Sequence, residues 1–204
     1  MIMNGAIGAL GLGDWWSNEL TDQDRKDILH GYTPFGLSIG SSLGSDLIEG
    51  NVVLEQGKGD FLACLAGWFE KDNPDLTQKI LMKAESVANI SSSAKEMHFT
   101  YQALIQFHYK RRSIDKYNYN KAIFYCEKQI EVSKEALFEI KKLINSDDDF
   151  APSHLGYKQL SIIYEKEKRY IDALGLVLKA EKDGWHGDWN ERAERLQRKI
   201  NRNQ

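Results

Sequence analysis

Apolar residues between His154 and Trp185 follow two helical spacings, separated by a short polar turn at 165–169. The first spacing places Tyr157, Leu160, Ser161 and Tyr164 on one helical face, and the second does the same for Ala173, Val177 and Ala180. Two short antiparallel helices cannot bury their apolar faces without neighbours. The pattern therefore predicts a stack of helical hairpins, an all-α solenoid whose surface binds other molecules.

The same offsets recur twice earlier in the chain. One set is Phe61, Cys64, Leu65, Trp68, Thr77, Leu81 and Ala84. A middle set is Tyr101, Leu104, Ile105 and His108, followed after a longer turn by Ala122, Cys126 and Gln129. Small residues at these positions let two helices approach closely, and the rings fill the space between hairpins. We expect about three hairpins on this evidence.

This arrangement resembles the tetratricopeptide repeat family, whose unit of about 34 residues places a large residue, Leu, a small residue and Tyr on its first helix. Its second helix carries Ala, an aromatic or aliphatic residue, and Ala. The chain departs from the family at Thr77 and Gln129, and the closing proline is missing from all three units. The resemblance covers 58–187 and implies a TPR-like solenoid.

Three domains follow from the pattern: an irregular Gly-rich region at 1–57, the repeats at 58–187 and a capping helix at 188–204. Within 1–57 we expect a helix over 14–30 and a Gly/Ser-rich loop over 35–59. Thr21 is the predicted N-cap of that helix, with Asp24 completing a capping box.

Two helices beyond the repeat pattern are also predicted. Residues 120–145 form either one continuous helix or two helices that break near Ser133, followed by a polar linker at 146–153. The terminal helix starts at Asp188, with Glu191 completing a capping box. Its basic residues either stabilise the helix through its macrodipole, while the helix covers the last hairpin, or form a binding tail.

Composition excludes several classes of function. Lys and Arg number 27 against 30 Asp and Glu, for a net charge of −3, so nucleic acid is not an expected partner. No stretch reaches about 18 consecutive apolar residues, and the start of the chain lacks the positive charge of a signal peptide. We expect a cytoplasmic protein that does not enter membranes.

The residue types that bind metals or perform catalysis show no characteristic spacing. Cys64 and Cys126 are far apart and are expected to be small buried residues. The five histidines fall at repeat positions, helix ends or turns. We therefore expect no metal site, no cofactor and no enzymatic activity.

The resemblance implies that a partner lies against the first helix of each hairpin. The residues that it places there are Leu62, Ala66, Phe69, Phe99, Gln102, Gln106, Tyr109, Lys110, Lys158, Ile162 and Glu165. Lys110, Arg111 and Arg112 form a positive cluster that either holds an acidic segment or terminal carboxylate of a partner, or ends its helix in solvent.

Three functions are compatible with these sequence features. The first is a non-catalytic adaptor, chaperone-like or regulatory module that binds a protein or peptide on its concave face. The second is a structural subunit or homo-oligomer that docks through residues 1–13 and Trp15–Trp16. The third is an enzyme or small-ligand sensor that uses the segment 31–59.

Overall fold

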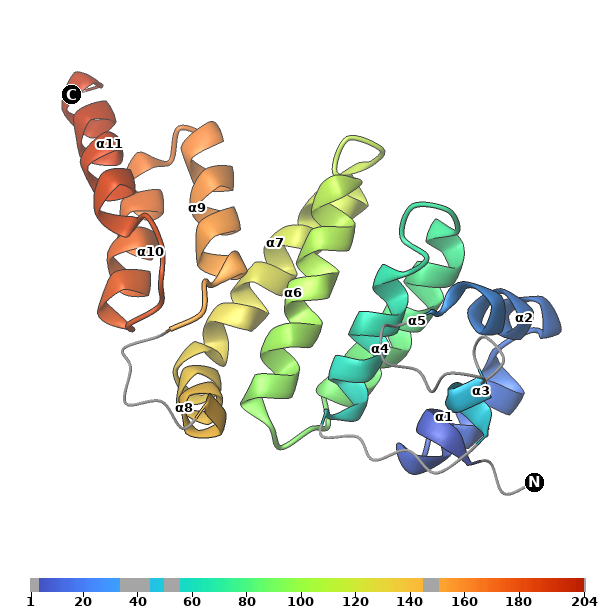
Figure 1. Ribbon diagram of the computed structural model, residues 1–204. Helices are drawn as coiled ribbons and strands as arrows, with labels where there is room; N and C mark the ends of the chain where they lie inside the picture. Colours follow the sequence, from blue (N-terminus) through green and yellow to red (C-terminus); the bar gives the residue numbers. More distant parts are fainter. Residues whose placement is uncertain (1–3, 34–44, 50–55, 145–150, 204) are drawn as a thin grey trace. The chain divides into compact units, whose positions relative to one another are not determined.

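A computed structural model describes residues 4–33, 45–49, 56–144 and 151–203, and these contain helices and no β-strand (Figure 1). The all-α prediction is therefore confirmed. The chain forms two compact units, Met1–Asn89 and Ile90–Gln204. Their boundary falls within the predicted repeat domain, whereas the predicted boundaries at 57 and 187 stay predictions. Across the described ranges, no helix combines the length and the apolar character needed to cross a bilayer.

The N-terminal unit contains five α-helices and one π-helix in its described residues. They are α1 (Gly5–Ala9), the π-helix Trp15–Glu19, α2 (Asp22–Gly31), α3 (Ser45–Ile48), α4 (Lys58–Gly67) and α5 (Pro74–Ala88). Helices α4 and α5 pack as a hairpin, and α1 packs against α3. Asn73 starts α5 by accepting a hydrogen bond from the amide of Leu76, with Pro74 at the first helical position.

The predicted helix over 14–30 is interrupted. Leu20 adopts an extended conformation with φ −94° and ψ 138° between the π-helix and α2. The predicted capping box at the start of α2 is confirmed, because Asp24 N donates to Thr21 Oγ1 at 3.1 Å and Thr21 N donates to Asp24 Oδ2 at 2.9 Å. The prediction of a single continuous helix was wrong, because the chain is extended at Leu20 and Thr21 then caps a new helix.

The two adjacent tryptophans lie inside the N-terminal unit. Trp15 and Trp16 are 2% and 4% exposed, and their rings meet edge to face with centroids 6.4 Å apart. Ile7, Leu10 and Leu12 are buried as well. The predicted docking of Trp15 and Trp16 on a neighbouring subunit required exposed rings, and the structure does not present them.

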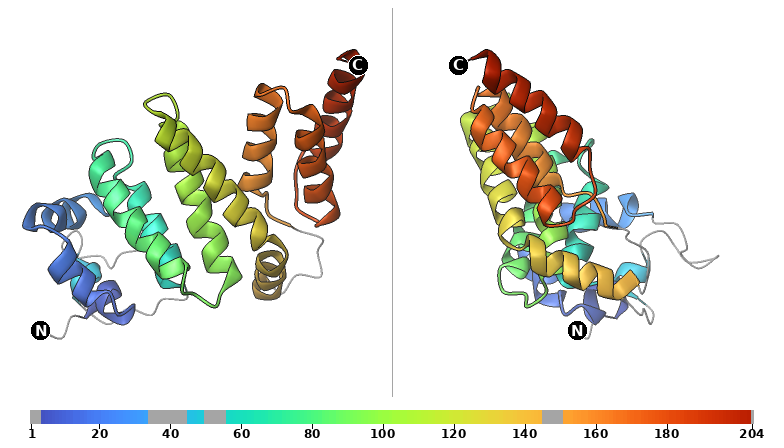
Figure 2. Two further views of the ribbon diagram at one scale, coloured as in Figure 1. Left: turned by 180° about the vertical axis from the view of Figure 1, so that it is seen from behind. Right: turned by 90° about the vertical axis from the view of Figure 1, so that its left-hand side faces the viewer.

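The C-terminal unit contains six helices in its described residues. They are α6 (Ala94–Lys110), α7 (Lys116–Glu131), α8 (Ser133–Ile144), α9 (Leu155–Lys166), α10 (Tyr170–Lys182) and α11 (Trp189–Arg202). Helices α6 and α7 form one hairpin, α9 and α10 form the next, and α7 packs against α9. The predicted break near Ser133 is confirmed, and α8 leaves α7 in a new direction (Figure 2).

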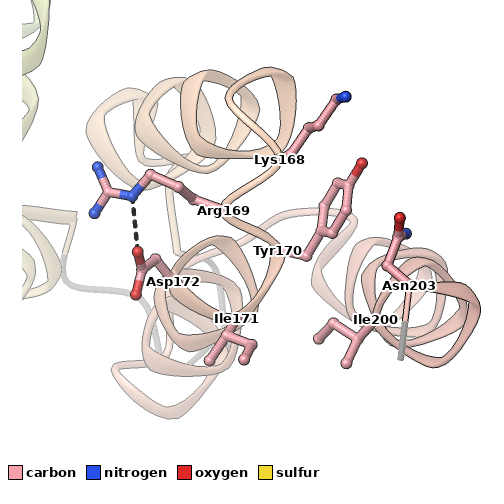
Figure 3. Close-up of a pocket in the computed structure, with 7 residues that line it drawn as sticks. All are labelled: Lys168, Arg169, Tyr170, Ile171, Asp172, Ile200 and Asn203. Atoms are coloured by element: carbon pink, nitrogen blue, oxygen red, sulfur yellow. Dashed lines mark hydrogen bonds and ion pairs between the residues drawn. The ribbon is translucent and has the colours of Figure 1, made fainter.

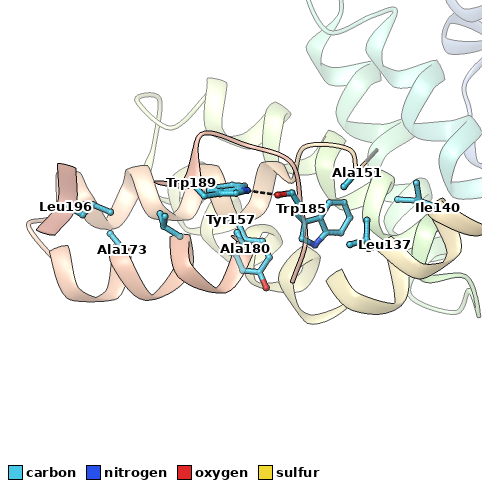
Figure 4. Close-up of a cluster of buried hydrophobic side chains, with 10 residues drawn as sticks. Leu137, Ile140, Ala151, Tyr157, Ala173, Ala180, Trp185, Trp189 and Leu196 are labelled. Carbon is cyan, nitrogen blue, oxygen red and sulfur yellow. Dashed lines mark hydrogen bonds between the residues drawn. The ribbon is translucent and has the colours of Figure 1, made fainter. Parts of the chain in front are cut away.

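The apolar faces predicted for the last hairpin form the core of this unit. Tyr157, Ala173, Val177 and Ala180 are fully buried in a cluster with Trp185, Trp189 and Leu196 (Figure 4). Because Ala173 and Ala180 are small, α9 and α10 can approach closely. Leu137 and Ile140 bring α8 into the same cluster, so the helix outside the repeat pattern shares the core of the last hairpin.

The hydroxyl of Tyr157 ties this core to three helices. It donates to Asp183 Oδ2 at 2.7 Å and accepts a hydrogen bond from Lys179 Nζ. Ser133 Oγ lies 3.4 Å from the same hydroxyl. Burial alone would favour a protonated Asp183 carboxyl, but the hydrogen bonds from Lys179 and Tyr157 outweigh it and hold the pKa of Asp183 below its usual range. The buried ring of Tyr157 therefore carries a satisfied polar group.

Helix α11 packs on α10, as a helix that covers the last hairpin must. Its predicted capping box is wrong. Asp188 is the N-cap residue but caps no backbone amide, and its carboxylate instead accepts a hydrogen bond from Arg192 Nε at 2.8 Å. An arginine one turn later offers a charged donor, which is a stronger partner for a carboxylate than a backbone amide.

Candidate functional site

A pocket of about 220 Å³ opens in the C-terminal unit where α6, the start of α9 and the start of α11 meet. Gln102, Gln106 and Lys158 line it, and all three were predicted to face a partner. The rest of its lining was not predicted and consists of Ser153, His154, Leu155, His186, Gly187, Asp188 and Trp189. The predicted pattern thus identified one wall of this pocket and missed the opposite one.

The wall from α6 and α9 follows from helical periodicity. Gln102 and Gln106 are one turn apart on α6, so their side chains share a face. Lys158 lies in the first turn of α9, which begins after the N-cap residue His154. The imidazole of His154 takes the place of the usual Ser, Thr, Asp or Asn, because its Nδ1 accepts a hydrogen bond from Tyr157 N at 3.2 Å.

The wall from 186–189 depends on two glycines. Gly184 has φ +86°, a left-handed conformation that ends α10 and turns the chain toward α11. A Cβ atom at Gly187 would lie 2.5 Å from the Trp189 ring, so only glycine fits there. Trp189 Nε1 donates to Trp185 O at 2.7 Å, which fixes the indole against the turn (Figure 4).

Three buried rings pack together, and one of them, His154, lines the pocket. The centroids of His98 and His154 are 4.9 Å apart, and that of Trp185 lies 4.9 Å from His98 and 4.6 Å from His154. Their exposed fractions are 0%, 1% and 3%. Within the described residues, His98 Nδ1, His154 Nε2 and Trp185 Nε1 have no hydrogen-bond partner. His154 meets the other two rings edge-on, whereas His98 and Trp185 are stacked on each other.

Both histidines are neutral at physiological pH. Burial lowers the pKa of His98 to about 4. Burial, together with nearby His98, lowers the pKa of His154 to about 2. A neutral His154 keeps the Nδ1 lone pair that caps α9, so the proton of its ring lies on Nε2.

Gln129 on α7 connects the two histidine segments. Its Nε2 donates to the carbonyl oxygen of His98 at 3.0 Å, and its Oε1 accepts from Gly156 N at 2.6 Å. A side chain at Gly156 would lie 2.8 Å from Gln129 Oε1 and 2.9 Å from the carbonyl oxygen of Cys126. Gln129, which departs from the repeat pattern, is therefore the residue that joins α6 and α9 through α7.

Other predicted partner residues of this unit are engaged within the fold. Glu165 accepts two hydrogen bonds from Arg195, at 3.1 and 3.0 Å, and pairs with Lys199 at 2.8 Å. Burial alone would raise the pKa of the Glu165 carboxyl, but the bonds from Arg195 and Lys199 outweigh it and lower that pKa. Phe99 packs on the core cluster. Ile162 and Tyr109 are half-buried and do not line the pocket.

The positive cluster at the end of α6 folds back on its own helix. Arg111 lies over the Phe107 ring at 3.8 Å and donates to the Phe107 carbonyl at 3.1 Å. Arg112 lies over the Tyr109 ring at 4.1 Å and donates to the Tyr109 carbonyl at 2.7 Å. Lys110 is exposed at the last residue of α6. Both arginines therefore donate to carbonyl groups in the last turns of α6, and the binding of an acidic segment by this cluster stays a prediction.

The partner face predicted for the N-terminal unit is buried. Leu62 and Phe69 are 0% and 6% exposed, and Ala66 is 1% exposed. Their predicted exposure was wrong because α4, which holds Leu62 and Ala66, is apolar on nearly every side, and Phe69 is buried just after its C-terminal end. Cys126 is buried as predicted, whereas Cys64 on α4 is exposed.

A second, wider pocket of about 400 Å³ lies between the start of α10 and the end of α11 (Figure 3). Its lining is Lys168, Arg169, Tyr170, Ile171, Asp172, Ile200 and Asn203. Arg169 Nε donates to Asp172 Oδ2 at 2.8 Å along one edge. No sequence pattern predicted this pocket, because one of its walls comes from α11, which lies outside the repeat pattern.

Comparison with known proteins gives no match to a family model, a curated protein or a solved structure. Any inference about function therefore rests on the geometry of the site alone. Among the described residues, no group of three His, Cys, Asp or Glu side chains is placed to hold a metal ion. Two of the segments proposed for a small-ligand site, 34–44 and 50–55, lie outside the described residues, as does most of the predicted linker at 146–153.

Proposed function

We propose that this chain is a non-catalytic, TPR-like helical module that binds a segment of a partner protein at the 220 Å³ pocket. The observation that carries this proposal is that Gln102, Gln106 and Lys158, from two different hairpins, line one pocket. Helical hairpins stacked side by side expose such a surface along their first helices. Partner binding at a site built from several hairpins is the use that this architecture favours.

The size and lining of the pocket favour a peptide side chain over a cofactor. Sites for small organic ligands usually enclose about 300–1,000 Å³, more than this pocket offers. The amides of Gln102 and Gln106 and the ammonium group of Lys158 supply hydrogen bonds, and Trp189 and Leu155 supply apolar surface. A mixture of this kind suits one or two side chains of an extended or helical peptide.

Site-specific photocrosslinking tests the proposal. A benzophenone amino acid at Gln106 should capture one specific protein in cells, whereas the same group at exposed Lys116, which does not line the pocket, should not capture it. The captured protein, once purified, should bind the wild-type chain, and Gln106→Glu should reduce its affinity. Equal capture at both positions, or binding that Gln106→Glu leaves unchanged, would contradict the proposal.

A further inference from the structure

Helix α10 has an exposed apolar face, its outer face, formed by Ile171, Gly175 and Leu178. These residues follow one another at helical spacing and therefore lie in one row. Ile171 and Leu178 are 72% and 48% exposed, and a Cβ atom at Gly175 would meet no atom within 4 Å. The opposite side of the helix, with Ala173 and Val177, is buried in the core of the unit. A row of exposed apolar side chains marks a surface on which another molecule packs.

The outer face of α10 runs into the 400 Å³ pocket between α10 and α11. Ile171 belongs to both, and Tyr170 and Ile200 complete the apolar part of the pocket (Figure 3). Leu178 follows Ile171 by seven residues, which places it about 10 Å further along the helix axis. One surface therefore carries an exposed apolar side chain, Leu178, and a hollow that can receive such a side chain.

These features are symmetric about one point on α10. The midpoint between Ile171 and Leu178 falls between Leu174 and Gly175, where the missing side chain of Gly175 allows a second helix to approach closely. If two copies of α10 pack antiparallel about a twofold axis at this midpoint, Leu178 of each copy meets Ile171 of the other. The two contacts are then identical, as the isologous interface of a twofold dimer requires.

The exposed charges at the two ends of α10 fit the same arrangement. Lys168 lines the pocket just before α10 begins, and Glu181 lies in the last turn of the helix. Both are exposed, and neither forms an ion pair within the described parts of the chain. Their midpoint is the same as that of the apolar pair, and exposed Glu167 and Lys182 share it too. An antiparallel pair of α10 helices therefore places opposite charges together at both ends.

We propose that the outer face of α10 is a homodimer interface, in which two copies of this chain pack antiparallel through Ile171, Gly175 and Leu178. Leu178 of each copy enters the apolar part of the other copy's pocket, and Lys168 of each copy pairs with Glu181 of the other. Because the contact uses one helix face and one pocket of each copy, the dimer should be reversible and depend on concentration. The interface goes beyond the proposed function, since it shares no lining residue with the 220 Å³ pocket.

Sedimentation of the full chain over a wide range of concentrations tests the dimer. We expect the wild type to pass from the mass of one chain to the mass of two. Leu178→Glu places a charge in both copies of the apolar contact and should raise the dissociation constant by about tenfold or more. Ile114→Glu changes another exposed residue, which lies ahead of α7 at 72% exposure, and should leave the dissociation constant unchanged. Circular dichroism at low concentration checks that both variants fold.

Charge reversal tests the antiparallel register. Lys168→Glu and Glu181→Lys each create two like-charge pairs in the dimer, so each should raise the dissociation constant about fivefold. The double variant restores opposite charges in both pairs and should return the dissociation constant to near the wild-type value. If the two substitutions acted only within one chain, their effects would add in the double variant.

Three outcomes would overturn the dimer. They are the mass of one chain at every concentration, equal effects of Leu178→Glu and Ile114→Glu, and a double charge variant that associates no better than the single variants. If the chain stays monomeric and a benzophenone amino acid at Leu178 captures a different protein, the outer face of α10 belongs to that protein. None of these results alters the capture expected at Gln106, so the proposed function stands or fails separately.

Discussion

The imidazole of His98 is stacked on the indole of Trp185, with ring centroids 4.9 Å apart and ring planes inclined by 6°. His154 meets both rings edge-on, with interplanar angles of 75° and 81°. Two titratable groups therefore lie in the centre of the aromatic packing of the C-terminal unit. This packing persists only while both rings are uncharged, because a buried unpaired charge is strongly unfavourable.

Acid should destabilise the C-terminal unit well above the pH at which carboxylates protonate. The folded pKa values, about 4 for His98 and about 2 for His154, lie below the unfolded value of 6.5. The unfolded chain therefore takes up protons first as the pH falls below 6.5. Between pH 7 and 5 each histidine should lower the free energy of unfolding by about 2 kcal/mol. Hydrogen exchange of the α6 and α9 amides, followed at increasing urea concentration and at each pH, measures this free energy of unfolding.

Two histidine variants separate this effect from general acid sensitivity. His98→Phe keeps a ring on Trp185 and should remove about half of the pH dependence. His186→Gln changes an exposed histidine of the same unit and should leave the pH dependence intact. An equal change in both variants would show that the buried rings are not its source.

A matched pair of glycine substitutions should have opposite signs. Gly156→Ala places a Cβ 2.8 Å from Gln129 Oε1 and 2.9 Å from the Cys126 carbonyl, so we expect a loss of about 2 kcal/mol or more. Gly175→Ala adds a Cβ to α10 where no atom lies within 4 Å. That variant should gain about 0.5–1 kcal/mol from helix propensity. Chemical unfolding measures both, and a gain at Gly156 would disprove the close approach of α7 and α9.

Removal of the Tyr157 hydroxyl should weaken the junction of α8, α9 and α10. Tyr157→Phe keeps the buried ring but removes one donor from the Asp183 carboxylate, which is 4% exposed and keeps Lys179 at 2.9 Å, Ser133 at 3.5 Å and Lys134 at 4.0 Å. We expect a loss of about 1–2 kcal/mol in the free energy of unfolding. Tyr170→Phe on the next helix, where the ring is half-buried, serves as the control and should change stability by much less.

Glu165→Gln should loosen α11 without unfolding the unit. The substitution removes the charge that accepts from Arg195 and Lys199, both of which are exposed enough to be solvated afterwards. We expect a loss of about 1 kcal/mol and faster hydrogen exchange in α11. Glu194→Gln, an exposed change on α11 itself, should leave the exchange as it is. Salt should reduce the difference between wild type and Glu165→Gln.

The helices and hairpins of the C-terminal unit were predictable because they follow from periodicity. Ala173, Val177 and Ala180 repeat at helical spacing, and all three are buried. The same reasoning failed for Leu62 and Ala66, since α4 has almost no polar side to mark which face is exposed. Periodicity identifies the exposed face of a helix that has one polar and one apolar side, but it cannot identify that face when both sides are apolar.

The candidate site was half predictable for a related reason. Gln102, Gln106 and Lys158 lie on helices, where spacing indicates which residues share a face. His186, Asp188 and Trp189 lie at a turn, and their positions depend on the conformation of Gly184 and the close contact at Gly187. The one sequence signal for that wall was the pair of glycines around Trp185. His154 as a helix cap could not be predicted, because imidazole is not among the preferred capping groups.

The capping of α9 by an imidazole links the integrity of a helix to a reactive lone pair. A serine cap offers electrophiles a weak nucleophile, whereas a ring nitrogen of His154 that becomes accessible is readily acylated. Once modified at Nδ1, the ring can no longer accept from Tyr157 N. Acylating reagents would therefore trap transient openings of the start of α9. Their rate of incorporation would report the rate of local opening at this helix start.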